Sequence, residues 1–270
     1  MHSDRHEIPV RKVSLPFGEN IPRHWFGDNA MQTHIFNGLN LVFPDGERFF
    51  VRSVMDHVDR IDDPALLAQV RGFAGQEGRH AHEHERYFAT MRAQGYRIDT
   101  FLRRFHKFTT LSTKFFPAAL RLSVTAGAEH YTATLGANAL ANPRLNEAHP
   151  VMRKLIAWHA MEEIEHKAVA FDVLQKVNPS YLLRIAGFLL ATLVLITWTV
   201  SATRMLLRQD GISKPEAKAM LRELERRDRG QMRRAIRDGF RIYFRRDFHP
   251  SQIEDRELAQ SFLAEVTAAA

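Results

Sequence analysis

Two Glu-x-x-His pairs, one in each half of the chain, constrain the fold more than any other feature. Glu77 precedes His80 by three residues, and Glu163 precedes His166 by the same spacing. Residues three apart lie on one face of a helix, so each pair places a carboxylate beside an imidazole. Both pairs therefore favour helices whose inner faces point at a common site.

A lone glutamate precedes each pair by roughly one helix length. Glu47 comes before the first pair and Glu129 before the second, so the chain is a rough internal duplication. Two antiparallel helices joined by a short loop bring such positions to similar heights. The pattern predicts a ferritin-like four-helix bundle whose inward side chains hold two metal ions.

The composition limits which metals fit. The chain has no cysteine, which excludes thiolate zinc sites, iron–sulfur clusters and disulfides. Two divalent ions repel each other in a low-dielectric core, and the four carboxylates would neutralise them. Oxygen and nitrogen donors favour iron, with manganese or zinc as alternatives.

The remaining sequence reads as helical, because no stretch shows strand-like alternation. The fold class expected is all-α, with helices over about 29–58 (interrupted at Pro44-Asp45-Gly46), 62–92, 101–137 (bent at Pro117) and 151–177. The predicted parts are an irregular N-terminal arm (1–25), the bundle (26–180), an apolar helix (181–207) and a basic C-terminal helical segment (208–270).

The apolar run Ile185–Thr203 has 19 residues without a charge, which is at the limit of what spans a bilayer. It could be a buried fifth helix, a membrane anchor or the lining of a tunnel for an apolar substrate. Between Arg204 and Asp247, 14 Lys/Arg stand against 7 Asp/Glu. This basic segment is either a solvated surface or a contact with anionic headgroups.

The bundle and the basic segment both favour the cytoplasmic side, which a single span cannot satisfy. A helix that is buried, or embedded without spanning, is therefore preferred. The polar N-terminus does not read as a secretory signal. We expect a cytoplasmic protein. Association with the inner face of a membrane is an open alternative.

His159 lies four residues before Glu163 and shares its helical face. The stretch HAMEEIEH, residues 159–166, resembles the metal-binding helix of p-aminobenzoate N-oxygenase type di-iron enzymes, which implies His159 as a seventh ligand. His84, one turn after His80, is expected to support the site rather than bind metal.

A wider resemblance covers nearly the whole chain. The stretches FPDGERFF, GQEGRHAHEH, EHYTA, WHAMEEIEHKAVAFDV and FHP are similar to those of the bacterial family of predicted metal-dependent hydrolases. The ligand set that this resemblance implies agrees with the one derived from spacing, namely Glu47, Glu77, His80, Glu129, Glu163 and His166.

These ligands predict an enzyme, and the first hypothesis is a non-haem di-iron oxygenase acting on an organic, lipid-like substrate. Its partners would be dioxygen and an electron donor. The alternative is a two-metal hydrolase, in which metal-bound water attacks the substrate. A nucleic-acid-binding helical protein is a minor alternative, since no recognised motif accompanies the basic segment.

Overall fold

The computed structural model describes residues 7–18 and 20–267, and its regular elements over these ranges are all helices, as predicted. The α-helices are α1 (Ala30–Met55), α2 (Pro64–Ala93), α3 (Asp99–Phe115), α4 (Ala118–Ala141), α5 (Pro150–His166), α6 (Val169–Val177), α7 (Tyr181–Gln209), α8 (Lys214–Arg227), α9 (Gln231–Tyr243), α10 (Arg256–Ser261) and α11 (Leu263–Thr267). The first six residues of the predicted arm and residue 19 lie outside the described ranges.

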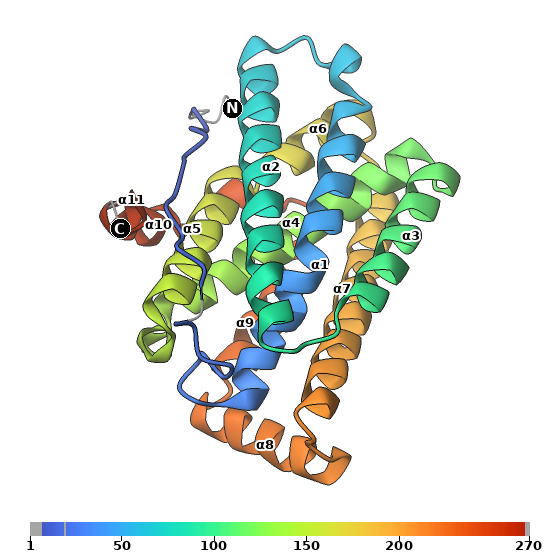
Figure 1. Cartoon of the computed structure of the whole chain (residues 1–270). Helices are drawn as coiled ribbons and strands as arrows, with labels where there is room; N and C mark the ends of the chain where they lie inside the picture. Colours follow the sequence, from blue (N-terminus) through green and yellow to red (C-terminus); the bar gives the residue numbers. More distant parts are fainter. Residues whose placement is uncertain (1–6, 19, 268–270) are drawn as a thin grey trace.

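Four helices carry the predicted ligands and pack around one centre (Figure 1). α1 packs against α2 and α4, and α4 packs against α5. The apolar helix α7 lies along both α1 and α4, while α8 crosses the end of the bundle where α1 begins (Figure 1). This arrangement brings the middle of α1, α2, α4 and α5 together.

Helix starts follow local sequence signals. The Asn29 side chain accepts a hydrogen bond from the Gln32 amide at the start of α1. Asp63 caps α2 in the same way, with Pro64 in the first turn, close to the predicted helix start at about residue 62. These caps satisfy amide groups that have no partner within the helix.

Three predicted boundaries are wrong. Pro117 separates α3 from α4 instead of bending one helix, because the residue before a proline is pushed into extended backbone, and Phe116 has a ψ of 139°. The helix predicted over 151–177 divides after His166. There the side chain of the buried Lys167 donates a hydrogen bond to the carbonyl of Ile253. Pro44, in contrast, lies inside a continuous α1, whose packing outweighs the lost backbone hydrogen bond.

One face of α7 is packed and the other is exposed. Phe188, Ala191 and Leu206 are buried, whereas Leu193 is 63% exposed. By length and composition alone α7 could cross a bilayer, although a single such helix is weak evidence for a membrane. The packed face fits a fifth helix buried against the bundle, one of the sequence alternatives, while the opposite face stays exposed among the described residues.

The close contact between α4 and α7 depends on small residues. A Cβ added to Gly187 would lie 2.1 Å from Ser123 Oγ and 2.5 Å from its carbonyl carbon. A Cβ on Gly127 would lie 2.6 Å from Phe188 Cα. The absence of side chains therefore lets the two backbones approach each other.

We expect Gly187→Ala to lower the free energy of unfolding by about 1–3 kcal/mol, because the added methyl forces α7 away from α4. Gly78→Ala is the matched control in α2, where an added Cβ meets nothing within 4 Å. That change should raise stability by roughly 0.5–1 kcal/mol, since alanine favours helix. Chemical denaturation of both variants measures the contrast, and equal effects would contradict the close-contact argument.

Candidate metal centre

Two groups of buried histidines and glutamates meet in the centre of the bundle. Within each group, one candidate ligand atom per residue lies within 4.8 Å of the others. The first group is Glu77, His80, Glu163 and His166, and the second is Glu47, His84 and His159. The side chains come from α1, α2 and α5, so helix packing and not a single segment assembles them.

Glu163 connects the two groups. Its Oε1 lies 2.8 Å from His159 Nε2 in the second group and 3.7 Å from His80 Nδ1 in the first. The rings of His80 and His159 stack with their centroids 4.2 Å apart. The two groups therefore form one continuous centre.

Glu129 of α4 lies beside this centre and outside both groups. Its Oε2 is 2.9 Å from His166 Nδ1, which leaves Nε2 of that ring 3.4 Å from Glu77 Oε1. A carboxylate on the far nitrogen fixes the tautomer and the orientation of a metal-binding histidine. The geometry thus gives Glu129 a hydrogen bond to His166 and one further oxygen without a partner.

A second carboxylate orients His80. Glu162 is fully buried, and its Oε2 lies 3.0 Å from His80 Nε2. Arg11, in the arm before α1, donates to Glu162 Oε1 at 3.1 Å and to both oxygens of Glu165. The arm therefore lies against the centre and supplies the counter-charge for Glu162.

The electrostatics reflect the crowding of buried acids. Burial and the neighbouring carboxylates raise the pKa of Glu47 and Glu77 well above its usual value. Burial also raises the pKa of Glu129 to about 7. For Glu163, burial is outweighed by the nearby imidazoles, chiefly His166, so its pKa is about 2.

The pKa values of the histidines also shift in opposite directions. Burial lowers the pKa of His80 and His84 well below the usual imidazole value. For His166, Glu129 and Glu163 outweigh burial and raise the pKa to about 9. Two of the site's imidazoles are therefore neutral, which is the form that binds metal.

Unpartnered polar atoms provide the test of whether a metal fits. Buried atoms without a hydrogen-bond partner include both oxygens of Glu47 and Glu77, one oxygen each of Glu129 and Glu163, His80 Nδ1 and His166 Nε2. Leaving so many buried acceptors unsatisfied is costly. Their convergence at one place fits a centre built for cations, and buried His/Glu clusters able to bind metal are thus present.

The comparisons with known proteins agree with this chemistry. A family model described as predicted metal-dependent hydrolase matches residues 9–254. The chain belongs to this family. No curated protein and no solved structure is similar enough to match. Membership in the family of predicted metal-dependent hydrolases makes the chain a metal-dependent enzyme, as the sequence predicted.

The first functional hypothesis is wrong. The family found over residues 9–254 supports the hydrolase alternative and not the di-iron oxygenase. The donor set did not distinguish an oxygenase from a hydrolase, because carboxylate and imidazole ligands in a helical core serve both kinds of chemistry. Spacing alone could not separate reactions that use the same ligands.

Two features of the site had little sequence signal. His84 lies in the second group, with Nε2 2.6 Å from His159 Nδ1, although a supporting role was expected for it. Its position one turn after His80 was the available clue. The contact of Arg11 with Glu162 had no signal in the sequence, because no local pattern links the N-terminal arm to α5.

A third group, His24, His34 and Asp210, lies away from the centre. The Asp210 carboxylate accepts bonds from both imidazoles at 2.7 and 2.6 Å and from Arg23 at 2.7 Å. These partners satisfy the carboxylate without a metal ion. The group ties the end of α7 to the start of α1.

Proposed function

We propose that the chain is a hydrolase that uses two divalent metal ions. The proposed ligands are Glu47, Glu77, His80, Glu129, His159, Glu163 and His166, with His84 as a further donor. The observation that carries the proposal is the set of buried, unpartnered carboxylate and imidazole atoms at one place. Family membership supports hydrolysis as the reaction.

The donor types suit manganese, iron or zinc, all of which accept oxygen and nitrogen ligands. Bound there, the ions would supply a nucleophilic water of lowered pKa and polarise the substrate. A pair is favoured over one ion because the donors form two groups joined by Glu163.

The protein's own side chains orient the donors and exclude water. Glu162 accepts a hydrogen bond from His80 Nε2, which leaves Nδ1 free for a metal. The rings of Phe73 and Trp158 pack against His166 and His80, with centroids 5.1 and 4.8 Å apart. Such packing restricts ring motion and strengthens electrostatic interactions at the centre.

Metal analysis and ester hydrolysis test the proposal together. The protein loaded with manganese, iron or zinc should hold close to two ions and hydrolyse activated esters, and chelation should remove both properties. Glu163→Gln should lower the rate at least about 100-fold, because the residue joins the two groups. Hydrolysis that survives chelation, or full metal content in this variant, would refute the proposal.

We also propose that the exposed face of α7 lies on a lipid surface. Leu189, Leu193, Ile196 and Val200 are exposed and spaced by three or four residues, so they form one apolar stripe. Arg104, Lys107 and Lys114 share an exposed face of the adjacent α3. An exposed apolar stripe together with exposed basic side chains suits an anionic membrane surface.

Vesicle sedimentation tests this location. The protein should bind vesicles that contain phosphatidylglycerol, and Leu193→Glu combined with Ile196→Glu should reduce binding roughly tenfold or more, given the apolar area withdrawn. Leu263→Glu replaces an exposed apolar residue of α11 and serves as the control. Equal binding by the double variant and the control would contradict the proposal.

A further inference from the structure

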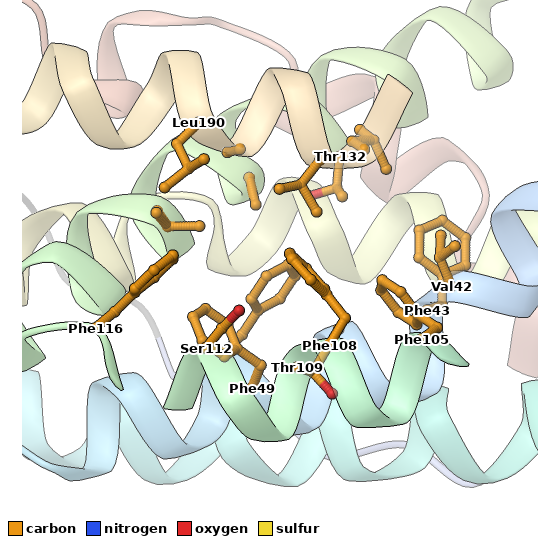
Figure 2. Close-up of a pocket in the computed structure, with 17 residues that line it drawn as sticks. Val42, Phe43, Phe49, Phe105, Phe108, Thr109, Ser112, Phe116, Thr132 and Leu190 are labelled. Carbon is orange, nitrogen blue, oxygen red and sulfur yellow. The ribbon is translucent and has the colours of Figure 1, made fainter. Parts of the chain in front are cut away.

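An apolar cavity lies between α1, α3, α4 and α7, next to the candidate metal centre (Figure 2). Its empty space is about 750 Å³, open solvent at the mouth included. Figure 2 shows Phe116 and Leu190 towards one end and Val42, Phe43 and Phe105 towards the other.

The lining offers almost no polar group to a ligand. Of its few hydroxyl residues, Thr109 donates to the His106 carbonyl and Thr132 donates to the Glu129 carbonyl. A polar ligand would lose its hydration here without replacement hydrogen bonds. A hydrocarbon would gain free energy in proportion to the area that it buries.

The apolar cavity adjoins a second cavity at the metal centre. This second cavity shares Phe43, Thr132 and Leu195 with the first, and His84, His159 and Glu163 line it. The Phe43 ring lies between them, with its centroid 4.6 Å from that of His159. A molecule in the apolar cavity can therefore present one end to the centre past Phe43.

The opposite end is flanked by exposed apolar side chains. Phe115 is 68% exposed and Leu189 is 47% exposed, beside the lining residues Phe116 and Leu190. Small lining residues, Gly46, Ala128 and Ala191, keep the passage free of bulky side chains. The cavity thus has an apolar body, exposed apolar side chains next in sequence to its lining at one end, and the metal centre beyond Phe43 at the other.

We infer that this cavity binds the unbranched hydrocarbon chain of an acyl ester substrate, with the carbonyl at the metal centre. That the chain ends in a hydrolysable group rests on the proposed function, whereas binding of the hydrocarbon does not. In the reaction, water oxygen bonds to the acyl carbon and the ester C–O bond breaks. The alcohol leaves with one proton of the water, and the carboxylic acid is the second product.

Calorimetric titration with butanoate, octanoate and dodecanoate tests the binding step without turnover. Affinity should rise about fourfold per added methylene until the cavity is filled. Equal affinity for butanoate and dodecanoate would overturn the inference.

Ala191→Phe should lower dodecanoate affinity at least about tenfold, since the added ring occupies the volume of several methylenes. Butanoate affinity and metal content should stay unchanged. Leu193→Phe adds a ring on the exposed face of the same helix and is the matched control. Ala191→Leu provides a smaller change if the phenylalanine variant does not fold, and unchanged dodecanoate binding in both would also overturn the inference.

Ester hydrolysis separates this inference from the proposed function. Chain-length-dependent binding without hydrolysis of any ester supports the hydrocarbon site and contradicts the hydrolase. Hydrolysis that is indifferent to chain length and to Ala191→Phe supports the hydrolase and contradicts the hydrocarbon site.

Discussion

Replacing Glu77 by glutamine is expected to stabilise the metal-free protein and to destabilise the metal-loaded one. Without metal, Glu77 is a buried acid among other acids, and its pKa is raised well above its usual value. Glutamine keeps the shape and removes the cost of burying a charge or of protonating it. The gain should be about 1–4 kcal/mol in the presence of a chelator.

With metal bound, the effect of the substitution on stability reverses sign. A ligand at 1,000 times its dissociation constant stabilises the folded state by about 4 kcal/mol, and the variant forfeits most of this. Thermal unfolding with chelator and with added manganese measures both effects. A structural carboxylate would give the same loss in both conditions, and that result would falsify the metal assignment.

Glu85→Gln is the matched control for Glu77→Gln. Glu85 lies on the same helix, but it is exposed and pairs with Arg48 at the surface. Its replacement should change stability by no more than about 0.5 kcal/mol, with or without metal. A reversal of sign in this control as well would show that the effect does not come from the centre.

Arg11→Met is expected to lower the free energy of unfolding by about 3–5 kcal/mol, because it leaves a buried charge without its partner. Glu162 is fully buried, and Arg11 is the cation that contacts it. Glu162 also holds His80 in place, so metal affinity should fall roughly 10–100-fold. Denaturant unfolding and metal titration measure the two effects.

The double variant Arg11→Met with Glu162→Gln separates charge from packing. Removing the stranded charge should restore at least about half of the lost stability, while the amide oxygen can still accept from His80. Lys12→Met, an exposed neighbour in the arm, should have an effect of at most about 0.5 kcal/mol. No recovery in the double variant would mean that Arg11 stabilises the protein through packing and its bonds to Glu165, and not by neutralising Glu162.

Local spacing explains what the sequence could predict. Glu77 with His80, and Glu163 with His166, share helix faces whatever the rest of the chain does, because the period of a helix fixes positions three apart. The start of α2 near residue 62 was predictable too, because Asp63 and Pro64 are local signals for the first turn of a helix. The all-α class and the grouping of these four side chains followed from such local patterns.

Other helix boundaries and residue roles depended on tertiary contacts as well as on local sequence preference. Pro117 ends a helix because Phe116 before it is extended, whereas Pro44 lies inside α1, which packs against α2, α4 and α7. The hydrogen bond between Glu129 and His166 required the relative height of α4 and α5, which loop lengths alone do not set.

The sequence by itself determined the donor types, their helical faces and the absence of thiolate chemistry. Only the tertiary structure decided that Arg11 reaches Glu162 across the chain, and that α3 and α7 enclose an apolar cavity beside the centre. The physical reason is that such contacts join residues far apart in the chain. They form only where helix crossings and small residues such as Gly187 let the backbones meet.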